Sequence, residues 1–184
     1  WLEGSKARHY SAAAIPLPEA VMSYRPKLHI VLHQPEIPYN TGSVGRTCVA
    51  VGAKLWLVRP LGFRLDDYYL RRAGLDYWKH LCWEVVDDYD SLTRRLLPCP
   101  TWYFSKTAAR RYTDVRFRQE DVFVFGCESQ GLPASLLASH QERTLRIPIR
   151  DDVRSLNLSN SVAVAAFEAL RQWAALTTSS ATDR

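Results

Sequence analysis

The chain has 184 residues, of which 47% are hydrophobic and 23% are charged, and its formal net charge is +5. This length favours one domain with its own buried core, and no apolar run approaches the roughly 20 residues that a membrane-spanning helix needs, so we expect no membrane association. The mild positive charge is compatible with nucleic-acid binding but does not establish it.

The spacing of cysteine and histidine predicts neither a disulfide framework nor a metal site. The four cysteines form no Cys-x-x-Cys pair, and the one His-x-x-x-His spacing, His29 and His33, falls in a β-type run and not on a predicted helix. Isolated thiols are typical of proteins in a reducing compartment. We therefore expect a cytoplasmic protein without a bound metal.

The start of the chain differs in composition from the rest. A short alanine run is followed by Pro16 and Pro18, so it is too short and too interrupted for a signal peptide. We expect a tail or extension over residues 1–26, one domain over residues 27–177 and a second tail over residues 178–184.

From Leu28 onward, short β-type runs alternate with helical patterns, which predicts an α/β fold with a mostly parallel sheet flanked by helices. The predicted strands are 28–33, 54–59, 101–105, 122–125 and 144–149. The predicted helices are 40–51, 66–75, 91–97, 133–138 and 158–176. Asn40 or Thr41 is the expected cap of the first helix, which Gly52 ends, and Asp90 or Ser91 is the expected cap of the third.

The last predicted helix has an unusually wide apolar face. Two adjacent stripes form it: Val162, Ala166, Leu170 and Trp173 in one, and Ala163, Phe167 and Ala174 in the other. Such a face covers a sheet, and a face of this width can also meet a second subunit. Packing within one chain is the simpler alternative.

A basic segment runs from Lys106 to Arg118, with five cationic residues, one acid and two interleaved aromatic residues, Tyr112 and Phe117. Cations beside aromatic rings can neutralise phosphates and stack on bases. A solvated face is the alternative interpretation.

Three polar, glycine-bearing segments follow predicted strands and precede helical patterns. They are Asn40 to Arg46, Phe125 to Gly131, and Arg146 to Pro148 leading into 154–160. α/β proteins assemble their ligand sites at such junctions, so the three segments predict one composite site.

The absence of two phosphate-binding motifs argues against some classes of enzyme, although the first junction can still bind an anion. The chain lacks the phosphate-binding loops Gly-x-x-x-x-Gly-Lys-Ser/Thr and Gly-x-Gly-x-x-Gly, which argues against kinases and dinucleotide oxidoreductases. Gly42 and Gly45 at a helix start can bring backbone amides close to an anion, and Arg46 can share that face. A solvated arginine is the alternative.

The other two junctions add a carboxylate and a surplus of neutral polar groups. Glu128 can orient a hydroxyl, balance a cation or cap a turn. Ile147 and Pro148 can line an apolar slot, and the start of the last helix carries Ser155, Asn157, Ser159 and Asn160. More polar groups are present than capping needs, and no Ser-His-Asp pattern is visible, which favours recognition of a polar ligand over nucleophilic hydrolysis.

The three junction motifs together resemble those of the SPOUT-class RNA ribose methyltransferases. The matching patterns are Asn-x-Gly-x-x-x-Arg at 40–46, Phe-Gly-x-Glu-x-x-Gly at 125–131, and Ile-Pro followed by Arg-Ser-Leu-Asn-Leu-Ser-Asn-Ser at 154–161. The segment from Pro35 to Gly42 and the Pro-Leu-Gly-Phe at 60–63 are similar to the small TrmL/YibK subgroup. The resemblance covers roughly residues 28–175.

This resemblance implies properties that composition and periodicity do not show. It implies a deep trefoil knot in the C-terminal part of the α/β domain, S-adenosylmethionine as the cofactor, and a homodimer with its site near the subunit interface. It also implies transfer of a methyl group to the ribose 2′-hydroxyl of the wobble cytidine or uridine, position 34, in the anticodon stem-loop of tRNA. A ribosomal RNA target and a non-catalytic RNA-binding protein on the same scaffold are the alternatives.

The resemblance also assigns roles to individual residues. It places Arg46, Asn40, Glu128, Ser155 and Asn157 in the catalytic centre. It assigns cofactor binding to Phe104, Ser105, Gly126, Glu128, Gly131, Ile147, Pro148, Ser155, Leu156 and Asn160. A guanidinium normally stays protonated, so we expect Arg46 to orient a phosphate or stabilise an oxyanion rather than act as a base. Candidate tRNA contacts are Arg71, Arg72, Arg110, Arg111 and Arg154.

Overall fold

The computed structural model describes residues 25–65 and 77–179, with side chains as far as Ala174. Its strands are β1 (Leu28–His33), β2 (Ala53–Val58), β3 (Trp83–Val86), β4 (Thr101–Phe104), β5 (Arg110–Arg111), β6 (Val122–Phe125) and β7 (Thr144–Arg146). Its helices are α1 (Pro38–Val51), α3 (Tyr89–Leu96), α4 (Ala134–Ser139) and α5 (Leu158–Ser179), with short 3-10 turns η2 (Trp78–His80), η3 (Tyr112–Asp114) and η4 (Gln141–Arg143).

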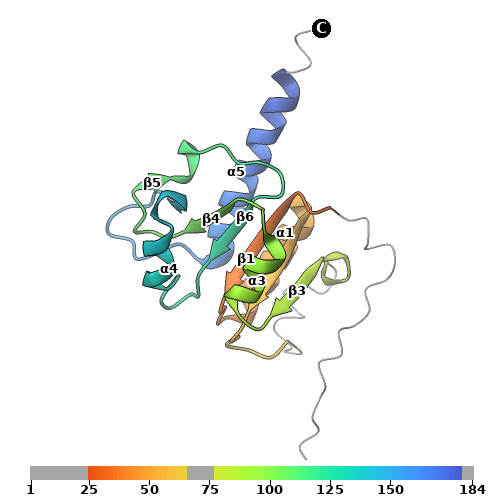
Figure 1. Ribbon diagram of the computed structural model, residues 1–184, viewed down its shortest axis with the longest axis vertical. Coiled ribbons are helices and arrows are strands. Elements are labelled where there is room, and N and C mark those ends of the chain that lie inside the picture. The colour runs from red at the N-terminus through yellow and green to blue at the C-terminus, as the bar shows by residue number, and fades with distance from the viewer. Residues whose placement is uncertain (1–24, 66–76, 180–184) are drawn as a thin grey trace, which may run out of the picture.

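All of the pairings between these strands are parallel, and they form a single sheet in the order β3-β2-β1-β6-β4-β7-β5. Helices cover both faces, with α1 and α5 behind the sheet and α3 and α4 in front of it in Figure 1. The predicted α/β architecture is therefore confirmed. Parallel strands covered on both faces must be apolar on both sides, which explains why β1 is buried along its whole length.

Alternate residues of one strand supply two separate cores. Ile30 and Leu32 of β1 face the cluster that contains α1 and α5, where Val44 and Val162 are fully buried. Val31 of the same strand faces the cluster that contains α3 and α4. This alternation follows from the two-residue period of a strand.

Most predicted elements are present, with differences at their edges. Strands 28–33 and 122–125 agree in full, whereas β7 ends three residues earlier than predicted, just before Ile147 and Pro148. β3 and β5 were not predicted, because β3 is a short strand at the edge of the sheet and β5 is a pair of exposed arginines without an apolar pattern. The predicted helix 66–75 and all but the last two residues of the predicted tail 1–26 lie outside the described residues.

Both predicted helix caps were wrong. Helix α1 begins at Pro38, and its N-cap Ile37 makes no side-chain capping bond, so Asn40 and Thr41 lie inside the first turn. In α3 the cap is Asp88, which accepts a hydrogen bond from the Ser91 amide at 2.6 Å. Several polar residues in succession made the helix start ambiguous in the sequence. The side chain of Asn40 bonds to Glu128 and Asn157 and does not cap α1.

The last helix divides its two predicted stripes between the core and solvent. Val162 and Ala166 are fully buried, while Phe167 is 54% exposed. The far part of α5 is fixed to the segment before β6, since Gln172 bonds to Phe117 N and Val115 O, and Trp173 Nε1 donates to Phe117 O. Among the described residues, no helix has the length and apolar character to cross a membrane.

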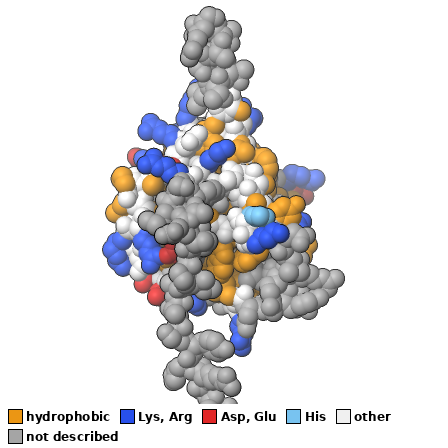
Figure 2. Space-filling model, turned by 90° about the vertical axis from the view of Figure 1, so that its right-hand side faces the viewer, with side chains coloured by type: hydrophobic (Ala, Val, Ile, Leu, Met, Phe, Trp, Pro, Cys, Tyr) orange, Lys and Arg blue, Asp and Glu red, His pale blue; other side chains and the backbone are white. Residues whose placement is uncertain are grey.

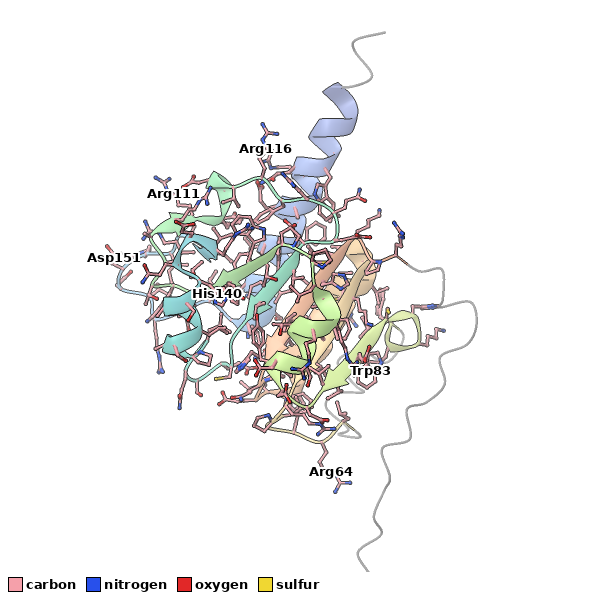
Figure 3. The ribbon with its side chains drawn as sticks, viewed as in Figure 1. Arg64, Trp83, Arg111, Arg116, His140 and Asp151 are labelled. Carbon is pink, nitrogen blue, oxygen red and sulfur yellow. The ribbon has the colours of Figure 1, made fainter. Side chains whose placement is uncertain are left out.

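The basic segment 106–118 presents its cations but not both of its aromatic rings. Arg111 and Arg116 point outward at the periphery in Figure 3. Phe117, however, is only 2% exposed and packs against Trp102 and Phe123. The segment therefore offers charge to a phosphate backbone, and its Phe117 ring is not available for stacking on bases.

Candidate active site where three junctions meet

Two glutamates join the first and second junctions at the carboxyl ends of β1 and β6. The Glu128 carboxylate accepts hydrogen bonds from the amides of Glu36 at 2.8 Å and Ile37 at 3.3 Å, and from Asn40 Nδ2 at 2.9 Å. In return, the Glu36 carboxylate accepts from Ser129 N at 2.9 Å and Ser129 Oγ at 2.6 Å. These Ser129 donors lower the pKa of Glu36. Each acid is thus satisfied by donors from the opposite loop.

Asn40 carries the connection on to the third junction. Its Oδ1 accepts from Asn157 Nδ2 at 2.9 Å, and Asn157 Oδ1 accepts from the amide and hydroxyl of Ser159 at 2.9 and 2.7 Å. Asn157 therefore caps the start of α5 while its amide nitrogen holds Asn40. The three junctions therefore lie together in the structure, as the sequence predicted, joined by the side chains of Glu128, Asn40 and Asn157.

Two glycines permit the close backbone approaches that this site needs. A Cβ on Gly126 would lie 2.0 Å from the carbonyl carbon of Gly131 and 2.2 Å from the amide of Leu132. A Cβ on Gly62 would lie 2.7 Å from Glu36 Cα, and the Gly62 amide donates to Pro35 O at 2.9 Å. The loop at 60–63 thus supports the segment that carries Glu36.

Arg46 lies outside this hydrogen-bond network. Its side chain is exposed on α1, and its guanidinium lies over the Tyr77 ring, 4.9 Å from the ring centroid. An open cavity of about 490 Å³ lies between α1 and α5, and Arg46 is not among the residues that line it. The cavity is lined by Tyr39, Asn40, Ser43, Thr47, Asn157, Ser159, Asn160 and Ala163.

Comparison with known proteins identifies this arrangement. Residues 27–167 match the model of the SpoU rRNA Methylase family, which is most of the chain. The chain belongs to this family.

Relatives of known activity and known structure support the assignment. A tRNA (cytidine(34)-2′-O)-methyltransferase of Burkholderia cenocepacia is 49% identical over 147 residues, which cover 78% of this chain and 94% of that protein. A solved structure concerned with the 2-OH methylation of C/U34 on tRNA is 46% identical with a TM-score of 0.78, covering 80% of this chain and 97% of that one. The SpoU methyltransferase AviRb of Streptomyces viridochromogenes, solved with AdoMet, has the same fold at 23% identity, with a TM-score of 0.69 and coverage of 80% and 58%.

In this SpoU-family chain, the residues predicted to bind a cofactor occupy different environments. Phe104 is buried, with its ring stacked on Phe125 at 4.5 Å, so only its backbone can face a ligand. Ser105 Oγ lies 2.9 Å from Thr107 Oγ1, and Ile147 packs partly against the core. Pro148, Ser155, Leu156 and Asn160 are exposed, and the glycines act through their backbone.

Three residues of the site were not identified from the sequence. The Glu36 carboxylate accepts hydrogen bonds from Ser129, which joins the second junction to the first. The Tyr77 ring packs against the Arg46 guanidinium. The position of Glu36 between two prolines after a strand was the available signal for the first. No sequence pattern places Tyr77 beside Arg46, because the contact joins α1 to a segment 31 residues further along the chain.

Replacing Glu128 with alanine is expected to loosen the junctions and lower stability. The buried Asn40 amide would lose its acceptor, and leaving such a donor unsatisfied costs about 1–3 kcal/mol. Urea unfolding measures the loss. Glu142→Ala, which removes an exposed acid from η4, is the matched control, and equal stability of the two variants would contradict the role given to Glu128.

Proposed function

We propose that this chain is an S-adenosylmethionine-dependent tRNA methyltransferase that methylates the ribose 2′-hydroxyl of nucleotide 34, a cytidine or uridine. The observation that carries the proposal is that hydrogen bonds through Glu128, Asn40 and Asn157 join the three motif segments, the first of which also carries the exposed Arg46. Relatives that are nearly half identical over most of their length and carry this activity by name support the substrate.

The exposed surface at the carboxyl ends of β4, β6 and β7 fits the proposed cofactor. Leu156 and Val153 are apolar yet 37% and 42% exposed, which suits a flat adenine ring. Glycine backbone at 126 and 131 and the Ser105 hydroxyl offer polar partners for the ribose and amino-acid parts. When bound, S-adenosylmethionine supplies an already activated methyl group.

The residues of the chain then have to position the ribose and manage the proton of its hydroxyl. Arg46 is the proposed catalytic residue, since its exposed guanidinium can hold the RNA phosphate or stabilise the developing oxyanion. Asn40 and Glu128 bond to each other, and Glu128 also accepts from the amides of Glu36 and Ile37, so we assign both as positioning residues that set the start of α1. Asn157 positions α5 in the same way, and the exposed Ser155 hydroxyl remains available to the cofactor or the ribose.

The test of the proposed function is transfer of labelled methyl groups from S-adenosylmethionine to unmodified bulk tRNA, followed by nucleoside analysis. A 2′-O-methylated pyrimidine at position 34 is the expected product. Methylation of ribosomal RNA instead would move the target to the alternative class. Cofactor binding without transfer to either RNA would support a non-catalytic role.

We also propose a homodimer formed through α1 and α5. Tyr39 on α1 is 63% exposed, and Val164 and Phe167 on α5 are 38% and 54% exposed. Exposed apolar side chains on two adjacent helices are typical of subunit contacts.

Phe167→Glu is expected to shift the protein from dimer to monomer, because it would bury a charge in the contact. Light scattering coupled to size-exclusion chromatography measures the mass. Leu97→Glu, at a site 72% exposed on the α3 side of the sheet, is the control that should remain dimeric. A Phe167→Glu variant with the mass of the unmodified protein would refute this interface.

Three further properties belong to the same proposal. A trefoil knot is supported by the connection before β6, which crosses α5 in Figure 1 and is bonded to it through Gln172 and Trp173. A methyltransferase domain over residues 27–177, between tails at 1–26 and 178–184, is supported by the family match to 27–167. A cytoplasmic location is supported by the tRNA substrate and by four cysteines, all described, that are free thiols.

A further inference from the structure

A second cavity, of about 500 Å³, lies on the other face of the sheet between α3 and the α4–η4 segment. Thr101 and Val122, the first residues of β4 and β6, line it, so it opens toward the amino ends of the strands. The candidate active site is at the carboxyl ends. A volume of this size is typical of small-molecule sites.

The lining of this cavity is mainly apolar. Leu92 and Leu96 of α3 form one wall, and Pro98 and Pro100 contribute from the segment that follows. On the opposite wall, the rings of Tyr103 and His140 pack with centroids 4.5 Å apart. Figure 3 shows His140 in front of the sheet, over the central strands. Walls of this kind accommodate a flat ring.

The tyrosine on this wall has an unused hydrogen-bond donor. Tyr89 donates its hydroxyl hydrogen to Tyr103 Oη at 3.0 Å, so the hydrogen of Tyr103 itself has no acceptor among the described residues. Tyr103 is only 3% exposed, and burial raises its pKa, so the hydroxyl stays protonated. A buried donor without a partner is costly, and a ligand acceptor would satisfy it.

The histidine has the complementary vacancy. His140 Nδ1 lies 2.9 Å from the carbonyl oxygen of Leu136, which can only accept, so Nδ1 carries the hydrogen. In the neutral ring, Nε2 is then an acceptor, and no donor bonds to it in the described part of the chain. A ligand with a carbonyl next to an N–H group would match the Tyr103 donor and the His140 acceptor.

Arg143 is the arginine among the residues that line this cavity. Arg143 is exposed, lies 4.9 Å from the Trp102 ring centroid and forms no ion pair with any described residue. Burial raises the pKa of Asp121, and the nearby charge of Arg143 opposes that rise without an ion pair between them. The Oδ2 atom of Asp121 accepts from Trp102 Nε1 and Arg118 N, while its buried Oδ1 has no hydrogen-bond partner among the described residues. The guanidinium is therefore available to an anionic group such as phosphate.

We propose that this cavity binds a nucleoside monophosphate whose base carries a carbonyl beside a ring N–H, as uracil does. The base lies between α3 and the Tyr103 and His140 rings, its carbonyl accepts from Tyr103, its N–H donates to His140, and its phosphate binds Arg143. The site is separate from the proposed cofactor site, because the two open at opposite ends of the strands.

The test is isothermal titration calorimetry with uridine 5′-monophosphate in the presence of saturating S-adenosylhomocysteine, which blocks the cofactor site. We expect binding at least tenfold tighter than that of uridine, which lacks the phosphate. Binding should also be at least tenfold tighter than that of 3-methyluridine 5′-monophosphate, which lacks the N–H, and than that of adenosine 5′-monophosphate, which lacks the carbonyl. These comparisons use the unmodified protein, so no folding defect can affect them.

Two variants connect the binding to the named groups. Tyr103→Phe keeps the ring and removes the donor, and it should weaken uridine monophosphate binding about tenfold. Arg143→Gln should reduce the affinity for the monophosphate to that for uridine while leaving uridine unchanged. Arg94→Gln, an exposed arginine of α3 outside the cavity lining, is the control that should bind normally. Absence of binding, competition by S-adenosylhomocysteine, or unchanged affinity in both variants would overturn the proposal.

Discussion

Arg46→Ala is expected to reduce methyl transfer to tRNA by at least about 100-fold while leaving cofactor affinity almost unchanged. Removal of one preorganised donor that stabilises developing charge typically costs on the order of 100–1,000-fold in turnover. Cofactor binding should persist because Arg46 projects from α1, makes no contact with the Glu128–Asn40–Asn157 network and stacks on Tyr77.

The measurement pairs labelled-methyl transfer with calorimetric titration of S-adenosylhomocysteine. Arg46→Lys is informative because it keeps the charge but loses the planar fork, so we expect it to recover only a small part of the activity. Arg94→Ala is the control for loss of an exposed arginine. Loss of cofactor binding together with activity in Arg46→Ala would assign Arg46 to the cofactor site instead.

Gly126→Ala is expected to cost about 3 kcal/mol of stability, the upper end of typical overpacking effects. The added Cβ would lie 2.0–2.3 Å from backbone atoms of Gly131 and Leu132, and backbone cannot rotate away as a side chain can. The variant should also lose cofactor binding, since the 126–131 loop would have to open.

Gly131→Ala separates crowding from backbone strain. A Cβ there would meet no atom within 4 Å, but the residue has a φ of 74°, which costs a non-glycine residue roughly 1–2 kcal/mol. Chemical denaturation of both variants should therefore rank Gly126→Ala as the more destabilised. The reverse order would contradict the close packing of Gly126 against Gly131.

The sequence predicted the architecture well because the signals for it are local. Continuous apolar runs marked β1 and β6, and the glycine at 52 marked the end of α1. Elements with weak local signals were missed, such as β5, which is held in place only by its pairing with β7. Arg110 and Arg111 carry no strand signal of their own, and they form a strand only because the fold places them beside β7.

The position of the site could be predicted from the sequence, but the hydrogen-bond partners of its residues could not. Turn residues at strand ends placed Asn40, Glu128 and Asn157 near one another. The sequence did not reveal that the Asn40 side chain donates a hydrogen bond to Glu128 instead of capping α1. The choice between the two depends on a partner 88 residues away, which no local pattern records.

The mutual contacts of Glu36 and Glu128 have a consequence for folding. The donors for each acid come from a loop about 92 residues distant in the sequence, so neither loop can reach its final form before the other is in place. Forming one set of contacts bears the entropy of closing the loop, and the second set then forms without bearing that cost again. We therefore expect the two loops to become ordered together, so that a chain in which one loop is displaced also loses the geometry of the other.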